Sequence, residues 1–134
     1  MKGKEKITRE LTRAEEQIMQ VLWNLEKGVV HEVMEHLPDP KPAYNTVSTI
    51  IRILEQKGFV GHKAYGRTHE YFPLISKTEY TKTHFRNFVA NYFENSYKSL
   101  ASFFTSEENL SISELEDIRK LMEQEILRKK KRIK

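Results

Sequence analysis

Residues 44–74 read YNTVSTIIRILEQKGFVGHKAYGRTHEYFPL, and this stretch decides the fold. The apolar residues of its first part recur at helical spacing, which predicts a helix from about Tyr44 to Lys57 that stops at Gly58. Two strand-like runs follow, Phe59–Ala64 and Thr68–Leu74, joined across Tyr65-Gly66-Arg67. Its central glycine can supply the positive φ of a tight hairpin turn. The stretch therefore predicts a helix followed by a β-hairpin.

Two further helices are expected before this stretch. Thr12-Arg13-Ala14-Glu15 is a capping box, in which the Thr hydroxyl and the Glu carboxylate bind the first free amides of a helix, and Gly28 lies just past the end of that helix. A short second helix fits His31–Leu37, and the proline-rich residues 38–42 then force an extended linker. Three helices followed by a hairpin are typical of a winged helix-turn-helix, whose third helix enters the major groove of DNA while the hairpin reaches the adjacent backbone.

The second half of the chain is expected to be helical. Two more capping boxes, Ser76-Lys77-Thr78-Glu79 and Ser111-Ile112-Ser113-Glu114, predict helix starts, and another helix fits around Tyr97–Thr105. The predicted fold class is therefore mainly α with a small β-hairpin wing (α+β). We divide the chain into a winged helix-turn-helix DNA-binding domain, residues 1–75, and a helical dimerisation domain with a basic C-terminal tail, residues 76–134.

The outer face of the third predicted helix is rich in Thr, Ser and Asn. These residues lower helix propensity, whereas exposed helix faces usually prefer Glu and Lys, so the cluster suggests a role in readout rather than an ordinary solvated face. Short polar groups and an arginine can bind base edges and phosphates, and the hairpin can bind the backbone unless it is a simple solvated turn. The predicted DNA-contacting residues are Asn45, Thr46, Ser48, Thr49 and Arg52 on the helix, and Lys63, Tyr65, Arg67 and Thr68 on the hairpin.

The helices after the hairpin carry many large apolar residues. They have too little chain around them to bury that surface alone, so pairing with a second copy is expected, and a two-fold dimer places two recognition helices on successive major-groove faces. The alternative is a ligand cavity lined by the aromatic residues. The predicted dimerisation residues are Phe85, Phe88, Val89, Tyr92, Phe93, Leu100, Phe103, Phe104, Leu115, Ile118 and Met122.

The net charge of +4 and the pI of about 9.2 suggest a nucleic-acid partner, but most of this basicity lies in the tail Arg128–Lys134. Residues 1–75 hold eleven Lys or Arg against ten Asp or Glu. Charge alone therefore does not indicate DNA binding. The tail could remain solvated or could add salt-sensitive attraction to DNA.

Several classes of function lack the residues they need. The chain contains no cysteine, which excludes disulfides, thiolate metal sites and a cysteine nucleophile. His62, His69 and Glu70 could meet across the hairpin, but no further ligand is apparent, so we expect no metal and no cofactor. We also find no nucleophile–base pair, carboxylate pair or phosphate loop, and predict that the protein is not an enzyme. Without a signal peptide or a long apolar run, it is expected to be cytoplasmic, with no stable membrane insertion.

Several motifs together resemble the penicillinase-repressor family of winged-helix regulators (the BlaI/MecI/CopY type). The resemblance extends from about Leu11 to Glu123, and its motifs agree in order and spacing. They are Leu11-Thr12-Arg13-Ala14-Glu15 with Met19, Leu22 and Trp23, then Asn45-Thr46-Val47-Ser48-Thr49, Lys57-Gly58-Phe59-Val60, Gly66-Arg67 with Tyr71 and Pro73-Leu74, and Leu110-Ser111 with Glu114-Leu115-Glu116 and Leu121.

The resemblance implies a homodimeric repressor of a dyad-symmetric operator, induced when a membrane sensor-protease leads to cleavage in the dimerisation region. It implies recognition-helix contacts from Asn45, Thr46, Ser48 and Thr49, and a wing contact from Arg67. The chain departs from the family at Pro42-Ala43, where Trp-Ser is common, and at Asn45, where Lys is usual, so its half-site should differ. The usual Asn-Phe cleavage pair aligns with Ser102-Phe103, and the missing cysteines argue against copper sensing.

The leading hypothesis is therefore a dimeric transcriptional repressor that binds a double-stranded DNA operator and is released by proteolysis. One alternative is a small-molecule-responsive winged-helix regulator that uses the aromatic helices as a pocket. Another is a winged-helix protein-interaction module that binds no DNA.

Overall fold

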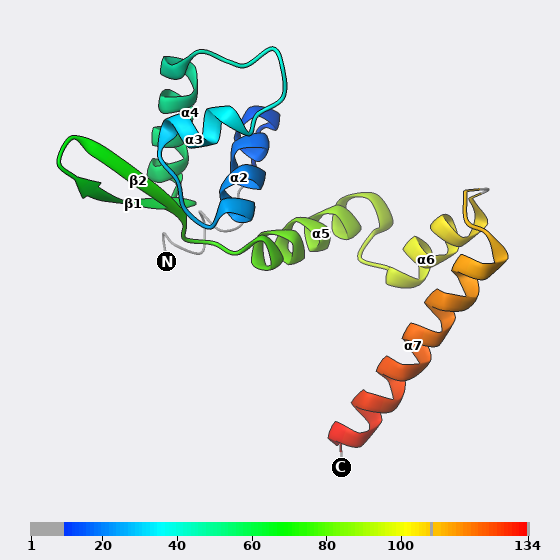
Figure 1. The fold of residues 1–134 in the computed structure, drawn as a ribbon. Helices are drawn as coiled ribbons and strands as arrows, with labels where there is room; N and C mark the ends of the chain where they lie inside the picture. Colours follow the sequence, from blue (N-terminus) through cyan, green and yellow to red (C-terminus); the bar gives the residue numbers. More distant parts are fainter. Residues whose placement is uncertain (1–9, 108, 134) are drawn as a thin grey trace. The chain divides into compact units, whose positions relative to one another are not determined.

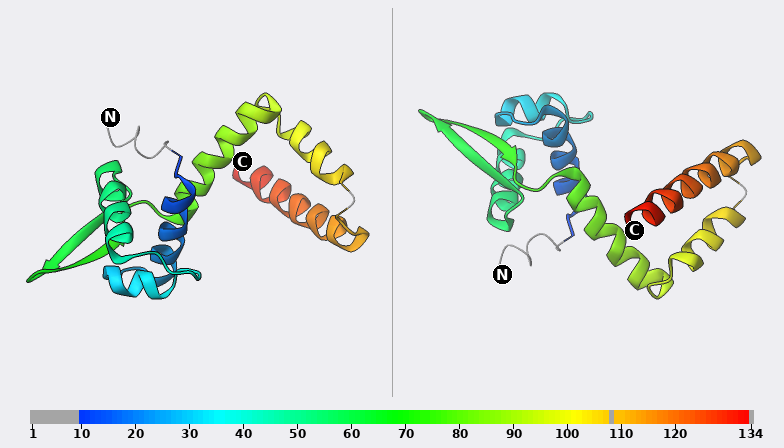
Figure 2. Two further views of the ribbon diagram at one scale, coloured as in Figure 1. Left: turned by 90° about the horizontal axis from the view of Figure 1, so that it is seen from above. Right: turned by 90° about the horizontal axis from the view of Figure 1, so that it is seen from below.

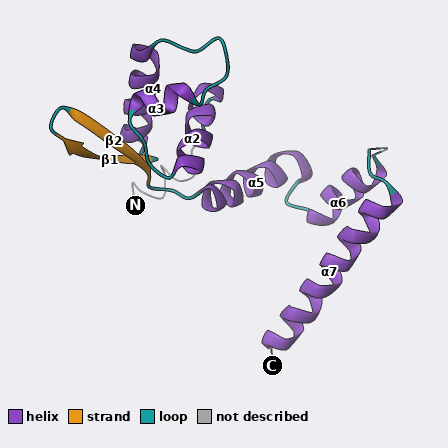
Figure 3. Ribbon diagram, viewed as in Figure 1, coloured by secondary structure: helices purple, strands orange, loops and turns teal. Residues whose placement is uncertain are grey.

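The computed structural model describes residues 10–107 and 109–133. Its first elements are the helices α2 (Arg13–Leu25), α3 (Val30–Glu35) and α4 (Tyr44–Lys57), followed by the antiparallel strands β1 (Val60–Tyr65) and β2 (Thr68–Pro73) (Figure 1). The helices α5 (Lys77–Phe93), α6 (Tyr97–Ser106) and α7 (Ile112–Ile133) complete the described chain. Figure 3 shows that helix dominates and that the strands are confined to one hairpin. The predicted fold class, mainly α with a small hairpin wing, is confirmed.

Local capping signals set several helix ends. The amide of Glu15 donates to Thr12 Oγ1 over 3.2 Å, and the amide of Thr12 donates to Glu15 Oε1 over 2.9 Å, so α2 begins with the predicted capping box. Reciprocal bonds of the same kind join Ser76 to Glu79 and Ser111 to Glu114. Gly58 ends α4 in the left-handed conformation, with φ of 89°.

The second helix is displaced from its predicted position. We expected His31–Leu37, whereas α3 spans Val30–Glu35. The amide of Val29 donates to Glu32 Oε1 over 3.0 Å, which caps the helix one residue earlier than expected. The extended linker predicted for residues 38–42 contains no helix or strand.

The hairpin closes through a two-residue turn. Tyr65 pairs with Thr68, and Gly66 between them has φ of 64°, as the predicted turn requires. At the other end of the hairpin, the backbone N–H of Gly28 donates to the Tyr71 carbonyl over 2.9 Å and the reverse bond measures 2.8 Å. The loop between α2 and α3 therefore holds the base of the hairpin, while its tip projects away from the three helices (Figures 1 and 2).

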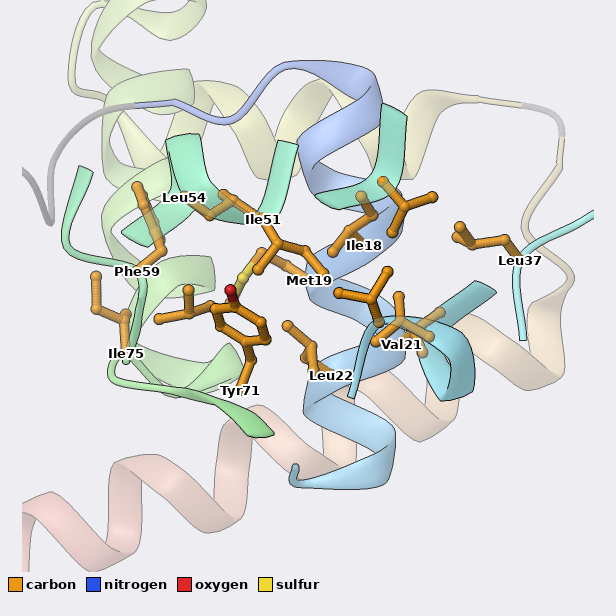
Figure 4. Packing of buried hydrophobic residues seen from close by; sticks show 14 of the residues in the cluster. Ile18, Met19, Val21, Leu22, Leu37, Ile51, Leu54, Phe59, Tyr71 and Ile75 are labelled. Carbon is orange, nitrogen blue, oxygen red and sulfur yellow. The ribbon is translucent and has the colours of Figure 1, made fainter. Parts of the chain in front are cut away.

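The core of this part of the chain lies between α2, α3, α4 and the base of the hairpin. Figure 4 shows the ring of Tyr71, from β2, beside Met19 and Leu22 of α2. The predicted apolar stripe of α4 faces this core, because Val47, Ile51 and Leu54 are fully buried and Ile50 packs against the cluster. Burial of this stripe fixes which side of α4 turns outward.

One ion pair joins α2 and α4, two of the helices that enclose this core. Glu15 is 5% exposed, and Lys57 Nζ donates to both of its carboxylate oxygens, over 2.9 and 2.8 Å. Burial by itself would raise the pKa of Glu15, but the bonds and charge of Lys57 and the bonds of Thr12 lower it below its ordinary value. This contact ties the start of α2 to the end of α4.

The start of α5 packs with the winged-helix core. Tyr80 is buried, its hydroxyl accepts from the amide of Leu11 over 2.9 Å, and its ring lies 5.8 Å from that of Phe59. Trp23 Nε1 donates to the Ile75 carbonyl over 2.9 Å. The compact units of the chain divide after Asn87, inside α5. The predicted division into a DNA-binding domain, residues 1–75, and a dimerisation domain, residues 76–134, concerns function and stays a prediction.

The second unit, from Phe88 onward, holds the end of α5 with α6 and α7. Positive φ values at Glu94 and Asn95 end α5. The ring of Phe93 lies 5.7 Å from Phe88 and 5.6 Å from Phe103, so α5 and α6 contact each other. No described residue of α6 or α7 is buried. Within the described residues, no helix has the length and apolar character needed to cross a membrane.

Candidate nucleic-acid interface

The residues predicted to read DNA on α4 all lie on its outward side. Asn45, Thr46, Thr49 and Arg52 are exposed, and Ser48 is half-buried. Their direction follows from the burial of the opposite stripe, since residues on one helix recur every 3.6 positions. The polar face is therefore presented by a helix whose rotation the core has fixed.

Arg52 lies folded along its own helix. Its Nη2 is 3.4 Å from Ser48 Oγ and its Nε is 3.5 Å from the Ser48 carbonyl oxygen. Both distances are long for hydrogen bonds, so a phosphate or a base could replace these contacts with little loss. The guanidinium group carries a full positive charge at this point of the surface.

The predicted residues of the hairpin are exposed near its tip. Lys63 Nζ lies 5.3 Å from the ring centroid of Tyr65, within the range of a cation–π contact. Thr68 pairs with Tyr65 across the strands, and Arg67 is in the turn beside them. Among the residues that the structure describes, Arg67 has no hydrogen bond or ion pair. Its guanidinium group is available for an external anion.

A concave pocket of about 530 Å³ joins the two sets of residues. Ser48 and Arg52 contribute from α4, and Arg67 and Thr68 contribute from the hairpin. Its further lining residues are Val29, Val30, His31, Tyr44, His69 and Tyr71. The remaining predicted contacts, Asn45, Thr46, Thr49, Lys63 and Tyr65, lie outside this pocket. We call it the α4–wing notch.

Three polar residues of this notch, His31, Tyr44 and His69, were not among the predicted DNA contacts. The ring of His31 lies 4.8 Å from that of Tyr44, so the start of α3 meets the start of α4. Tyr44 could have been predicted from the sequence, because it directly precedes the polar run of α4. His69 is one residue past the predicted contact Thr68.

The three hairpin residues considered as metal ligands, His62, His69 and Glu70, do not come together in one cluster. The rings of His62 and His69 stack 4.2 Å apart, and His62 Nδ1 lies 2.5 Å from Glu55 Oε2. Glu70 pairs with Lys63, whereas His62 pairs with Tyr71, so Glu70 points from the other face of the hairpin. Across the described ranges, no group of three or more His, Asp or Glu side chains could hold a metal ion.

The predicted dimerisation residues differ in how far they are covered. The exposed ones are Phe85, Phe88, Tyr92, Phe103 and Met122, and the half-buried ones are Phe93, Leu100, Phe104, Leu115 and Ile118. Val89 is 1% exposed, so its side chain is already covered by this chain. Tyr92 is 73% exposed and is the most open of the aromatic residues in this set.

The predicted cleavage pair lies inside a helix. Ser102 and Phe103 are both exposed, and both belong to α6. The carbonyl of Ser102 lies 3.3 Å from Thr105 Oγ1, and the carbonyl of Phe103 accepts from Ser106 Oγ over 2.8 Å.

Comparison with known proteins gives one family and several relatives. The profile of the family described as penicillinase repressor matches residues 11–124. The methicillin resistance regulatory protein MecI of Staphylococcus aureus (strain N315) is 25% identical over 116 residues, which cover 86% of this chain and 94% of MecI. The penicillinase repressor of Bacillus licheniformis is 25% identical over 122 residues, which cover 90% of this chain and 95% of that protein.

Two solved structures also match. The solution structure of the DNA-binding domain of the repressor BlaI gives a TM-score of 0.47 at 27% identity and covers 52% of this chain and 87% of that domain. A structure of the CopR repressor gives a TM-score of 0.43 at 28% identity and covers 51% of this chain and all of the other.

Proposed function

The chain belongs to the penicillinase repressor family, and from this premise we propose that it is a homodimeric transcriptional repressor. It would bind a dyad-symmetric DNA operator through α4 and the hairpin. The names of its relatives, a resistance regulatory protein and a penicillinase repressor, support regulation rather than enzymatic catalysis.

The α4–wing notch is the observation that carries this proposal. It brings Arg52 of α4 and Arg67 of the hairpin to one concave surface, beside the hydroxyls of Ser48 and Thr68. Two guanidinium groups and two hydroxyls are suited to the oxygens of a phosphate backbone. Asn45, Thr46 and Thr49, outside the notch, remain free for base edges in the major groove, which admits one α-helix.

A matched set of variants tests this placement. Arg67→Ala and Thr46→Ala alter the hairpin and the outer face of α4, and Arg86→Ala removes an exposed arginine of α5 as a control. Binding is measured by gel shift on the promoter DNA of the protein's own gene and on a random duplex of equal length. Arg67→Ala removes a proposed phosphate contact and should weaken binding to both duplexes. Thr46→Ala removes a proposed base contact and should weaken promoter binding more than random-duplex binding, whereas Arg86→Ala should bind both like the unaltered protein.

Two results would contradict the proposal at different levels. If Arg67→Ala and Thr46→Ala both bind like Arg86→Ala, the interface is elsewhere on the chain. If the unaltered protein does not prefer the promoter to the random duplex, operator recognition itself is wrong.

We also propose that proteolysis at Ser102-Phe103 releases the operator, with a membrane sensor-protease as the partner. A protease binds its substrate in an extended form, so α6 must unwind first. Its exposure, with none of its described residues buried, makes that opening inexpensive. Mass spectrometry of the protein from cells producing both partners should find a fragment that ends at Ser102. An intact chain in derepressed cells would contradict this step.

The rival function, a small-molecule regulator with an aromatic pocket, finds less support. Phe88, Tyr92 and Phe103 are exposed on the surface of the second unit rather than turned into an enclosed space. Exposed aromatic residues of this number favour contact with another protein surface, here a second copy of the chain.

A further inference from the structure

The positive charge of the chain is concentrated at its C-terminal end. Of the 23 Lys and Arg residues, six lie in residues 128–134, which contain no acidic residue. The rest of the chain holds 17 Lys or Arg against all 19 Asp and Glu, a net charge of −2. Residues 1–127 therefore carry no excess of positive charge with which to attract a polyanion.

This basic end is a continuation of the last helix. The helix α7 runs to Ile133, past residue 124, where the family match ends. Residues 128–133 are all exposed. We call Arg128–Lys134 the basic end; its described residues, 128–133, belong to α7 and lie beyond the part of the chain that the family profile matches.

The cations of the basic end are almost unpaired within the chain. Arg128 donates a hydrogen bond to Glu125, and this bond, together with the charge of the carboxylate, raises the pKa of Arg128. Among the described residues, none of the four cations that follow, Lys129 to Arg132, forms an ion pair. Favourable interaction with the helix dipole accounts for cations in a last turn, but like charges three and four residues apart repel each other. An external anion would relieve that repulsion.

We propose that the basic end binds the phosphate backbone of DNA without regard to sequence, a role that rests on the proposed function of the chain. DNA carries one negative charge for about every 1.7 Å of its axis, and a helix rises about 1.5 Å per residue, so a run of consecutive cations spans several phosphates and those on the side that faces the duplex can bind them. The winged-helix region, with nearly balanced charges, supplies few such contacts by comparison.

A duplex fits this surface better than an anionic membrane does. A helix that lies in a membrane interface needs a broad apolar face opposite its charges. Residues 128–132 are all cationic, and five consecutive residues at 100° intervals point to every side of the helix. Only Ile133 interrupts the charge within the described part of the basic end.

The test compares two double variants of the full chain that remove the same charges. Lys131→Gln/Arg132→Gln alters the basic end, and Arg119→Gln/Lys120→Gln removes one Arg and one Lys from the exposed surface of α7 further up. Gln has a helix propensity close to that of Lys and Arg, so circular dichroism should show equal helicity. Binding to a random-sequence duplex is measured over a range of salt concentrations, with parallel measurements on the promoter DNA and on vesicles containing phosphatidylglycerol.

The basic-end variant should bind the random duplex at least about tenfold more weakly than the control variant. Its plot of log affinity against log salt should be shallower by roughly 2 to 3.5, because a dimer loses four cations and each phosphate contact contributes about 0.9 to the slope. Equal affinities and slopes for the two variants would overturn the inference. So would a loss of vesicle binding with an unchanged DNA slope, which would assign the basic end to membranes.

The promoter measurements separate this inference from the proposed function. If the unaltered protein prefers its promoter and the two variants behave alike, the basic end is not involved but the repressor proposal stands. If it shows no preference for the promoter, the repressor proposal fails, while the random-duplex slopes still decide the role of the basic end.

Discussion

Glu15 shows how one residue couples two helices, through a bond to a residue 42 positions further along the chain. Its carboxylate accepts from Lys57 at the end of α4 and from the amide of Thr12 at the start of α2. The sequence predicted the local half of this arrangement, the capping box. The bond to Lys57 was not predictable, because a buried ion pair depends on how two distant helices pack.

Replacing this carboxylate should destabilise the fold. Glu15→Gln keeps the size of the side chain but leaves Lys57 without its counter-ion, so we expect the free energy of unfolding near neutral pH to fall by about 1–3 kcal/mol. Glu16→Gln, at the exposed neighbouring position, is the control and should change it by less than about 0.5 kcal/mol. Urea unfolding measures both, and equal stabilities would contradict the expected role of the pair.

The same pair predicts a pH dependence of defined sign. The pKa of Glu15 is lowered in the folded state from its ordinary value of 4.5, so its contribution is fully present above that value. It is lost as the pH falls below 4.5 through the folded pKa. The stability difference between the unaltered protein and Glu15→Gln should therefore shrink on acidification over this range. A difference that grows instead would contradict the assigned direction.

At the scale of elements, short-range signals were sufficient to predict several helix boundaries. Capping boxes at Thr12, Ser76 and Ser111 and the glycine after α4 each act within one helical turn, and the structure begins or ends its helices there. The start of α3 was wrong by one residue, because Glu32 caps Val29 in a pattern without the usual Ser or Thr. The α4–wing notch escaped prediction, since three elements must pack before His31 and His69 face the same space.

The hairpin turn offers a prediction at this scale. Gly66 has a positive φ and open space around it, so substitution strains the backbone without creating a clash. Gly66→Val should disturb the turn and displace Arg67, weakening promoter binding about tenfold or more, whereas Gly66→Asn, which tolerates the left-handed region, should bind nearly normally. Gel shift measures binding, and urea unfolding checks the core. Equal binding by the Val and Asn variants would count against the wing contact.

At the scale of the whole molecule, self-association should be measurable. The 15.9 kDa chain is expected to sediment at about twice that mass at micromolar concentration. Met122→Lys places a charge in the apolar stripe of α7 and should yield monomers, whereas Glu123→Lys introduces the same residue one position further round the helix and should remain dimeric. A single 15.9 kDa species for the unaltered protein would contradict the dimer.

The hairpin, finally, is held by the rest of the fold at its base only. Gly28 and Tyr71 hold one end through paired backbone bonds, and Phe59 and Val60 are buried in the core, while a side chain at Gly66 at the other end would point into open space. In such a hairpin the thermal displacement of the backbone grows from the base toward the turn, so amide hydrogens should exchange slowest at Tyr71 and fastest near the turn. If the wing contacts DNA as proposed, a flexible tip on a fixed base would let it adjust to different groove widths while α4 keeps its position.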